Sequence, residues 1–474
     1  MSSLHFPDLQ QFIDCPREFW LAQQAETPRP RLPYPLAPEL RQLAAQRIEL
    51  QDQDPIWANF GPWRAAVDFI KASPNHPNQV RLYFVQASGS VYSPKHGFKE
   101  KYLKEWAFSY HLFCLAGYEV EQCYAIWIDK DYRYPGGEIP PKRLLKIHPL
   151  GQELAELRAE TALLMQKAEA LRLQKTAPKW DGQSFCKKKL ACPFIQKYHG
   201  QEIPAFSIFQ LPRHRLDRPP LDQALAQKKW DLTELDPELL PERWLLQQQS
   251  AKTGQAQVDV PALKEWLAQL QFPLQALDYE AVNPAVPFIP HSRPFQHIPF
   301  QFSWQVWPNK ETEDIVSTNF LAQDKKEPTA GLMQALLDCA QPQGSILVWH
   351  KTFERERNRE LAKRYPEHRD FLYRLNERLV DLEEIVTKGL YIDAKFEGRS
   401  SLKKVLPVLL PQMSYDELPI AEGLAAADAW WQLDQQPPQE QAQTRQALID
   451  YCQLDTFSLI KMVQLLMRKF GETV

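Results

Sequence analysis

Residues 273–281 read PLQALDYEA, and this short stretch indicates what kind of fold the chain adopts. An apolar run beginning at Leu274 is typical of a buried strand, and it ends in two acids, Asp278 and Glu280. Strand side chains alternate between the two faces of a sheet, so these carboxylates share one face. Their oxygens suit a hard cation such as Mg²⁺. A surface strand that carries two acids and binds nothing is the commoner explanation of the fragment taken alone.

A second acidic element lies near the end of the chain. Residues 447–460 read ALIDYCQLDTFSLI and are predicted to form a helix. A spacing of four places Tyr451 and Asp455 on one face of this helix. A phenol one turn from a carboxylate suits a hydroxyl that orients water beside a metal ion held by the carboxylate. The alternative is a core tyrosine next to a solvated aspartate.

A third acid lies between these two elements. Residues 345–349 are predicted to form a short buried strand, and HKTFE at 350–354 turns from it into a helix. Glu354 in the first helical turn would point at the same sheet edge, although an acid there also stabilises a helix N-terminus. Downstream, RLVDLEEI at 378–385 offers Asp381 after another short apolar run. Asp381 is the fallback for the role given to Glu354.

Strands and helices alternate around these acids, which predicts a mixed α/β fold. Three regions are expected: residues 1–205, a polar and proline-rich helical connector without its own core at 206–255, and residues 256–474. The expected strands are 63–70, 79–87, 124–128, 274–280, 298–306 and 345–349. The expected helices are 102–116, 150–173, 262–270, 330–340, 353–365 and 441–470.

Length and composition limit the classes of protein to which the chain can belong. With 474 residues and 55.2 kDa, it is long enough for two or three domains. The formal net charge of −3 means that nucleic-acid binding would have to come from local basic patches. No run approaches the roughly 18 apolar residues of a membrane helix, and the first residues do not resemble a signal peptide. Seven cysteines are too few for a disulfide scaffold, which predicts a reducing, cytoplasmic location.

The order of the acidic motifs resembles that of the DnaQ-like (DEDD) 3′–5′ exonucleases of the ribonuclease H-like superfamily. These enzymes carry D-x-E on the first strand, an acid after an H/N-x-x-F element, and Y-x-x-x-D on the last helix. The segment from LDYEAV to FQFSWQV, with YCQLDT near the end, resembles more closely a bacterial family of unknown function. That family joins an exonuclease-like half to an N-terminal half related to RecB-type nucleases. One position departs from the pattern, because Glu354 stands where aspartate usually follows phenylalanine.

This resemblance implies a ribonuclease H-like mixed sheet with flanking helices that hydrolyses phosphodiester bonds with two Mg²⁺ or Mn²⁺ ions. It implies that Asp278 bridges both ions and that Glu280 and Asp455 complete the site of one. Glu354 would help to hold the other ion, and Tyr451 would orient the attacking water. The implied substrate is nucleic acid, with single-stranded DNA favoured over RNA, and the implied direction is 3′ to 5′.

The N-terminal half resembles, more loosely, the RecB-type nucleases with their PD-(D/E)XK restriction-endonuclease α/β fold. Their active site needs an aspartate and then an E-x-K pair on the next strand. Asp68 in WRAAVDFI fits the aspartate, but the next strand, LYFVQASGS at 82–90, has neither the acid nor the lysine. The resemblance therefore predicts an eroded, inactive nuclease domain that is kept for substrate binding or for architecture.

Cysteines flank this half as they do in RecB-type nucleases that hold an iron–sulfur cluster. Such a cluster requires four thiolates, and the corresponding positions here offer three cysteines and a histidine. An iron–sulfur cluster, a zinc ion in a Cys₃His site and ordinary buried cysteines all remain open. The candidate ligands are Cys15, Cys186, Cys192 and His199.

Basic residues near Glu354 and in RSSLKKVLP at 399–407 are candidates for phosphate contacts, which usually provide non-specific affinity for nucleic acids. Interleaved glutamates make a solvated helix face an equal alternative. The candidates are Lys351, Arg355, Lys403 and Lys404. Two other functional classes stay open: a binding or scaffold protein in which both nuclease folds have decayed, and a nuclease that acts within a larger defence or DNA-processing complex.

Overall fold

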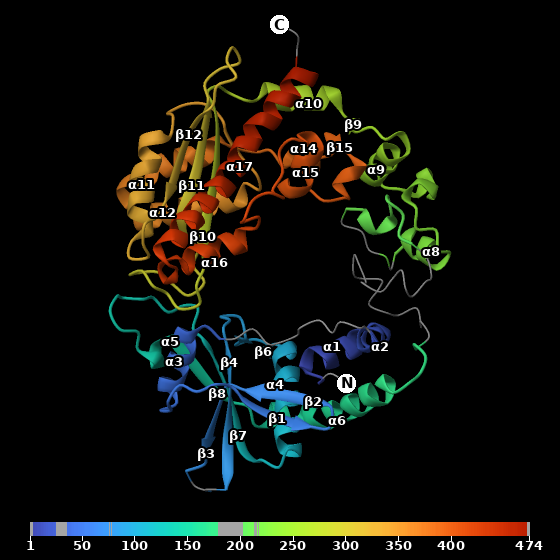
Figure 1. Ribbon diagram of the computed structural model, residues 1–474, viewed down its shortest axis with the longest axis vertical. Coiled ribbons are helices and arrows are strands. Elements are labelled where there is room, and N and C mark those ends of the chain that lie inside the picture. The colour runs from blue at the N-terminus through green and yellow to red at the C-terminus, as the bar shows by residue number, and fades with distance from the viewer. Residues whose placement is uncertain are drawn as a thin grey trace. The chain divides into compact units, whose positions relative to one another are not determined.

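The chain forms two compact units, and both contain helices and β-sheet (Figure 1). The N-terminal unit comprises Met1–Gln201 and Pro284–Gln296, and the C-terminal unit comprises Glu202–Asn283 and His297–Val474. This division differs from the expected boundaries, because residues 206–255 belong to the C-terminal unit and the segment after residue 283 to the N-terminal unit. The computed structural model describes residues 3–24, 36–74, 76, 78–178, 202–212, 216 and 218–471.

A four-stranded sheet with the order β3-β4-β7-β8 is the framework of the N-terminal unit. Strands β4 and β7 run parallel, and β3 and β8 are antiparallel to their neighbours. Helix α4 lies between β4 and β7 in the chain, and its Trp106 and Phe113 share a core with Phe84 and Trp127 of the sheet. The elements are α1 (Phe6–Asp14), α2 (Pro16–Gln23), α3 (Pro38–Arg47), β1 (Ile56–Phe60), β2 (Trp63–Val67), β3 (Phe69–Ala72), β4 (Gln79–Gln86), β5 (Tyr92–Ser93), β6 (Gly97–Phe98), α4 (Glu100–Leu115), β7 (Glu119–Ile128), α5 (Pro141–Leu144), β8 (Leu145–Pro149) and α6 (Gln152–Arg172).

The strand expected at 63–70 is broken at Asp68. Strand β2 ends at Val67 and pairs with β1, whereas β3 begins at Phe69 and joins the four-stranded sheet. The Asp68 carboxylate accepts a hydrogen bond of 2.7 Å from the backbone N–H of Val85 in β4. The expectation of one continuous strand is therefore wrong, because a half-buried polar contact marks the point where the chain changes sheets.

A five-stranded sheet with the order β12-β11-β10-β13-β14 is the framework of the C-terminal unit. Strand β11 is antiparallel to both of its neighbours, β10 and β12, and β13 and β14 run parallel to β10. The elements are α8 (Leu221–Ala226), α9 (Glu242–Thr253), β9 (Gln257–Val258), α10 (Val260–Ala268), β10 (Leu274–Val282), β11 (Ile298–Trp307), β12 (Val316–Leu321), α11 (Pro328–Cys339), β13 (Ile346–Val348), α12 (Thr352–Arg364), α13 (Arg369–Arg378), β14 (Leu379–Asp381), α14 (Glu384–Thr387), β15 (Tyr391–Ile392), α15 (Leu402–Leu409), α16 (Gly423–Trp431) and α17 (Pro438–Phe470).

The two faces of this sheet are buried against different helices. Leu277, Tyr279 and Trp304 lie on one face and share an apolar core with residues of α11, α12 and α13. Helix α17 crosses the opposite face, as Figure 1 shows, and contacts β10, β11 and β12. Since strand side chains alternate, Asp278 and its neighbour across the ladder, Ser303, lie on the face under α17.

Residues 206–255, which were expected to form a connector without its own core, contain buried side chains. Trp230 and Leu232 are 1% and 0% exposed. The side-chain amide of Gln248 donates hydrogen bonds of 2.9 and 2.8 Å to the backbone carbonyls of Leu232 and Leu235. Proline and polar residues masked this packing in the sequence, because short helical turns and side-chain hydrogen bonds replace a long apolar repeat.

Helix α17 has 33 residues, which exceeds the roughly 20 that a bilayer-spanning helix needs. Charged side chains recur along it, including Asp450, Asp455 and Lys461. Of the helices that the structure describes, none combines the length and the apolar character needed to cross a membrane.

Candidate metal centre in the C-terminal unit

Asp278 and Glu280 project from β10 toward α17. The antiparallel register places them opposite Ser303 and Gln301 of β11, and the β10–β11 pairing shifts directly after Glu280. The Glu280 side chain is buried, with 8% of the residue exposed. The D-x-E spacing therefore places both acids on one sheet face, as predicted from strand alternation.

Buried polar contacts determine where α17 sits on β11. The Gln301 side chain donates a 2.7 Å hydrogen bond to the backbone carbonyl of Leu448, and the hydroxyls of Ser303 and Thr456 lie 2.7 Å apart. A shift of the helix along the sheet would leave these buried groups without partners, which costs about 1–3 kcal/mol for each group. The contacts therefore define one register for α17, and this register places Asp455 over β10.

The carboxylates of Asp278, Glu280 and Asp455 converge, with one oxygen of each lying within 4.8 Å of the others. Burial and then the neighbouring carboxylates raise the pKa values of Asp278 and Glu280 well above their ordinary range. Burial also raises the pKa of Asp455 to about 6, against the opposing effects of a hydrogen bond from Tyr415 and the charge of Lys403. Oxygen ligands held together against their mutual repulsion fit a divalent hard cation.

Glu354 approaches this cluster from the first turn of α12. The residue is 2% exposed, and its Oε2 has no hydrogen-bond partner among the described residues. Burial, and then the charge of Asp278, raises the pKa of Glu354 well above its usual range. A buried carboxylate oxygen without a partner is costly unless a proton or a cation satisfies it. Glu354 therefore fits the role of an additional metal ligand, beside the three carboxylates that meet within 4.8 Å.

Asp381, the alternative to Glu354 as a metal ligand, is occupied by hydrogen bonds to the backbone. Its carboxylate accepts backbone hydrogen bonds from His350, Lys351 and Glu383 at 3.0, 2.9 and 3.1 Å. His350 has φ +71°, a left-handed conformation that is uncommon for a residue other than glycine. Asp381 thus stabilises the turn between β13 and α12, and it lies outside the three-carboxylate group.

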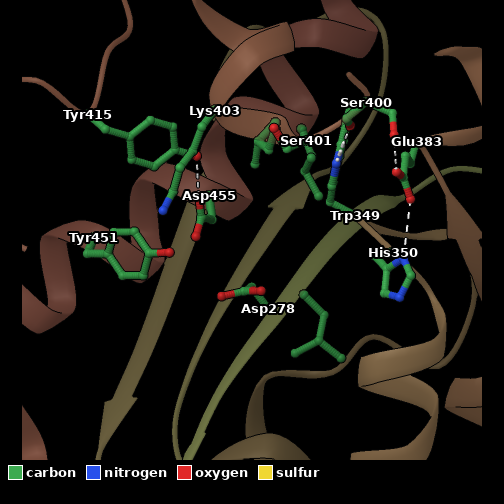
Figure 2. A pocket seen from close by; sticks show the side chains of 13 residues that line it. Asp278, Trp349, His350, Glu383, Ser400, Ser401, Lys403, Tyr415, Tyr451 and Asp455 are labelled. Carbon is green, nitrogen blue, oxygen red and sulfur yellow. Dashed lines mark hydrogen bonds and ion pairs between the residues drawn. The ribbon is translucent and has the colours of Figure 1, made fainter. Parts of the chain in front are cut away.

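A cavity of about 500 Å³ opens beside the carboxylates. Figure 2 shows Tyr415, Tyr451 and Lys403 gathered around Asp455, with Asp278 below them. Trp349 and His350 lie on the other side of the view, where Glu383 and Ser400 are also drawn. The lining residues are Leu277, Asp278, Trp349, His350, Glu383, Ser400, Ser401, Leu402, Lys403, Tyr415, Tyr451, Asp455 and Leu459.

Two contacts to the acids were not anticipated from the sequence. The Tyr415 hydroxyl donates a hydrogen bond to Oδ1 of Asp455. The Cys452 thiol donates to Oδ2 of Asp278 at 3.3 Å. Cys452 follows Tyr451 on the same helix, so its place in the sequence could have predicted that it lies near the acids. Tyr415 lies in a segment without periodicity, 40 residues before its partner, and no sequence pattern identifies it.

His350 is held at the cavity by its own contacts. Its Nδ1 lies 3.3 Å from Oε2 of Glu383, and the Ser400 hydroxyl donates to the other oxygen of Glu383 at 2.6 Å. The indole N–H of Trp349 donates to the Ser400 carbonyl at 3.1 Å. These contacts fix the orientation of an exposed imidazole that lines the same cavity as the carboxylates.

The four basic candidates fall into different environments, and one of them, Lys351, is half-buried and donates its backbone N–H to Asp381. Lys403 lines the cavity, whereas Lys404 pairs with Glu397 at 2.8 Å. Near Glu354, Arg355 lies 4.0 Å from Glu356. Glutamates thus engage part of this basic set, in agreement with the alternative of a solvated helix face. The aromatic residues of β11 are core rather than a surface for base stacking, since Phe300, Phe302 and Trp304 are 0% exposed.

In the N-terminal unit, Asp68 is half-buried and lies near Glu105 and Arg41. Burial raises the pKa of Asp68 to about 7, with a further increase from the charge of Glu105. Its hydrogen bond to Val85 gives the carboxylate a structural partner. Among the described residues, the three acids of the C-terminal unit are the group that offers three metal ligands together, and Asp68 is not part of any such group.

Of the four proposed cluster ligands, Cys15 is described. It is a buried cysteine whose sulfur accepts a hydrogen bond of 3.3 Å from the backbone N–H of Glu18, at the start of α2. Cys186, Cys192 and His199 lie outside the described residues, so the iron–sulfur or zinc site stays a prediction.

Comparison with known proteins gives a family match in the C-terminal unit. Residues 275–401 match the model of a family described as a domain of unknown function, DUF2779, a range that contains β10 and α12 but ends before α17. The chain is also similar to an uncharacterized protein of Mycoplasma pneumoniae, the MG366 homolog, with 30% identity over 217 residues. That match covers 41% of this chain and 32% of the relative, so the chain spans about a third of that protein. No solved structure matches the chain, and the ribonuclease H-like and RecB-like assignments stay predictions.

Proposed function

We propose that the C-terminal unit is a metal-dependent nuclease that removes nucleotides from the 3′ end of single-stranded DNA. The observation that carries this proposal is the meeting of Asp278, Glu280 and Asp455 within 4.8 Å, beside an open cavity. The acids come from segments more than 170 residues apart in the chain, and their burial raises their pKa values. Buried and strongly perturbed acids in a cavity are typical of functional sites. The 3′-to-5′ direction rests on the resemblance to DnaQ-like exonucleases.

The residues present fit two Mg²⁺ or Mn²⁺ ions. Asp278, Glu280 and Asp455 would hold one ion, and Glu354, whose Oε2 has no hydrogen-bond partner in the described chain, would help to hold another beside Asp278. When bound, such ions supply Lewis acidity to the phosphate and lower the pKa of a water molecule. The longer arm of glutamate at position 354 suits a ligand that reaches in from α12.

The chain itself would position the reacting groups. Tyr451 lines the cavity next to Asp455 and is suited to hold the attacking water through its hydroxyl. Tyr415 fixes the orientation of Asp455 by its hydrogen bond. In the reaction, the water oxygen bonds to phosphorus, the bond from phosphorus to the 3′ oxygen breaks, and a proton passes to that leaving oxygen. The products are a nucleoside 5′-monophosphate and a shortened strand with a free 3′ hydroxyl.

For the N-terminal unit we propose a supporting role in strand binding or architecture rather than catalysis. Asp68 is engaged by the backbone of β4, and the sequence lacks the E-x-K pair of RecB-type nucleases. A cytoplasmic location is part of the same proposal, supported by the free thiols of Cys114, Cys123, Cys339 and Cys452 in the described chain. A nucleic-acid strand is the expected partner.

Degradation assays with end-labelled substrates test the proposal. With Mn²⁺, the purified full-length protein is expected to shorten single-stranded DNA that carries a 5′ label in single-nucleotide steps. From DNA that carries a 3′ label, it is expected to release the labelled mononucleotide. Asp278→Asn should abolish both signals. Asp450→Asn, an exposed acid on the outer part of α17, is the matched control and should cleave normally. Cleavage that survives in Asp278→Asn would move the chemistry to another site, and no cleavage of DNA or RNA by the wild type would favour a decayed binding or scaffold protein.

A further inference from the structure

Lys403, in the first turn of α15, is the one lysine or arginine among the described residues that line the carboxylate cavity. Its ammonium lies 5.9 Å from the ring centroids of both Tyr415 and Tyr451, within the usual range of cation–π attraction. Figure 2 shows the side chain extending between these rings, close to Asp455. The ammonium is therefore directed into the site by two aromatic faces.

No hydrogen bond or ion pair within the described chain anchors this ammonium. The adjacent Lys404 differs, because its ammonium pairs with Glu397 at 2.8 Å. Lys403 is also exposed, so its long side chain is free to move between nearby anions. Two adjacent lysines on one helical turn thus have different environments, and only one of them faces the acids.

The charge of Lys403 already acts on the carboxylates. It lowers the pKa values of Glu280 and Asp455, against the larger increase caused by burial. The proximity of three carboxylates within 4.8 Å of one another favours a positive charge beside them. When divalent cations neutralise the same carboxylates, the attraction that holds Lys403 near them is lost. The nearest new anion would then be a phosphate of the bound strand.

We propose that Lys403 serves two anions in turn: it offsets the charge of the carboxylates in the metal-free protein, and it contacts a phosphate oxygen of the substrate once cations occupy them. This inference rests on the proposed nuclease function and adds to it a catalytic contact and a competition with the metal. Removing the charge should therefore tighten metal binding while it slows cleavage. A residue that only supports the fold would not move these two quantities in opposite directions.

The test compares full-length wild type with Lys403→Gln, Lys403→Arg and the control Lys388→Gln, a lysine that pairs with Glu384 at 2.8 Å and does not line the cavity. Mn²⁺ affinity is measured by electron paramagnetic resonance of the free ion. The rate of cleavage of single-stranded DNA is measured separately, at saturating Mn²⁺. Lys403→Gln should bind Mn²⁺ about fivefold more tightly and cleave roughly 10²-fold more slowly. Lys403→Arg should stay close to wild type in both assays, and Lys388→Gln should change neither.

The salt dependence of DNA binding, measured with non-catalytic Ca²⁺, provides a third readout. Loss of one phosphate contact should reduce the slope of log affinity against log salt by about 0.7 for a single strand. Mn²⁺ affinity that is unchanged or weaker in Lys403→Gln would overturn the competition, and an unchanged salt slope with normal cleavage would overturn the phosphate contact. Failure of the nuclease proposal looks different, since the wild type would then bind no Mn²⁺ or would bind it without cleaving any strand.

Discussion

Each unit of the chain carries an acid that resembles a nuclease motif, yet the two acids are used differently. Asp68 in the N-terminal unit accepts a hydrogen bond from the backbone of Val85, at the point where β2 gives way to β3. Asp278 in the C-terminal unit contacts a thiol and lies among other carboxylates. The first acid helps to stabilise a sheet through its hydrogen bond. The second belongs to a group of carboxylates whose burial together lowers the stability of the folded protein.

The difference shows that a motif acid is informative only together with what its oxygens contact. A carboxylate that satisfies a backbone donor stabilises the fold without a ligand, as Asp381 also does at the β13–α12 turn. A buried oxygen with no partner in the described chain, such as Oε2 of Glu354, is a cost that a ligand can offset. Four predictions test this contrast.

The largest effect is expected from replacing one acid in each unit. Asp455→Asn should reduce cleavage by about 10³-fold or more, because loss of a metal ligand removes several kcal/mol of transition-state stabilisation. Asp68→Asn should leave the rate within about twofold, since its carboxylate lies outside the cluster. Single-turnover cleavage with both variants measures the ratio. A large loss in Asp68→Asn would mean that the N-terminal unit takes part in catalysis.

The next effect concerns the two phenols beside Asp455. Tyr451→Phe should lower kcat by roughly 10²-fold, because the hydroxyl would no longer hold the attacking water. Tyr415→Phe should lower it by roughly tenfold, since this hydroxyl acts by orienting a ligand. Both variants keep the aromatic ring and its packing. Equal effects of the two substitutions on kcat would contradict the separate roles.

A smaller effect, on the free energy of unfolding, is expected from breaking the contact between α17 and β11. Thr456→Val preserves the shape of the side chain but leaves the Ser303 hydroxyl without its 2.7 Å partner, which should lower the free energy of unfolding by about 1–3 kcal/mol. Adding Ser303→Ala should cost little more, because the unpaired group is then gone. Chemical denaturation of the wild type, the two single variants and the double variant gives the interaction free energy between the two hydroxyls. Additive losses would mean that the two hydroxyls do not act as a pair.

The sequence predicted the elements that carry long regular patterns. The helix expected at 150–173 is α6 (Gln152–Arg172), and the strand expected at 274–280 is β10, two residues longer. The three acids of the cluster were also found from the sequence, because strand alternation and helical spacing are local rules. Their approach to one another follows from where α17 sits on the sheet.

Features that depend on a single tertiary contact were not predictable. Residues 63–70 are apolar enough for one strand, and nothing in their periodicity marks the change of sheet at Asp68. Glu354 and Asp381 both follow short apolar runs, and only the left-handed turn at His350 determines which acid binds backbone donors. Tyr415 reaches Asp455 from a segment with no regular pattern.

The smallest effect returns to Asp68 and concerns stability rather than rate. Burial raises its pKa from 3.8 to about 7, with Glu105 adding to the increase and Arg41 opposing it. The folded state therefore binds this proton more tightly than the unfolded chain does. The resulting stabilisation is complete below pH 4 and is lost as the pH rises toward about 7, with a slope of at most about 1.4 kcal/mol per pH unit.

Asp68→Asn keeps a carbonyl oxygen for the Val85 N–H but cannot ionise, so this part of the pH dependence should disappear. Hydrogen exchange of the Val85 amide in the full-length protein measures the local stability of β4 in both proteins between pH 5 and 8. The variant should gain protection relative to wild type as the pH rises, once the intrinsic exchange rates are taken into account. Parallel profiles would mean that Asp68 ionises at its ordinary pKa in the folded protein, as a solvated carboxylate does.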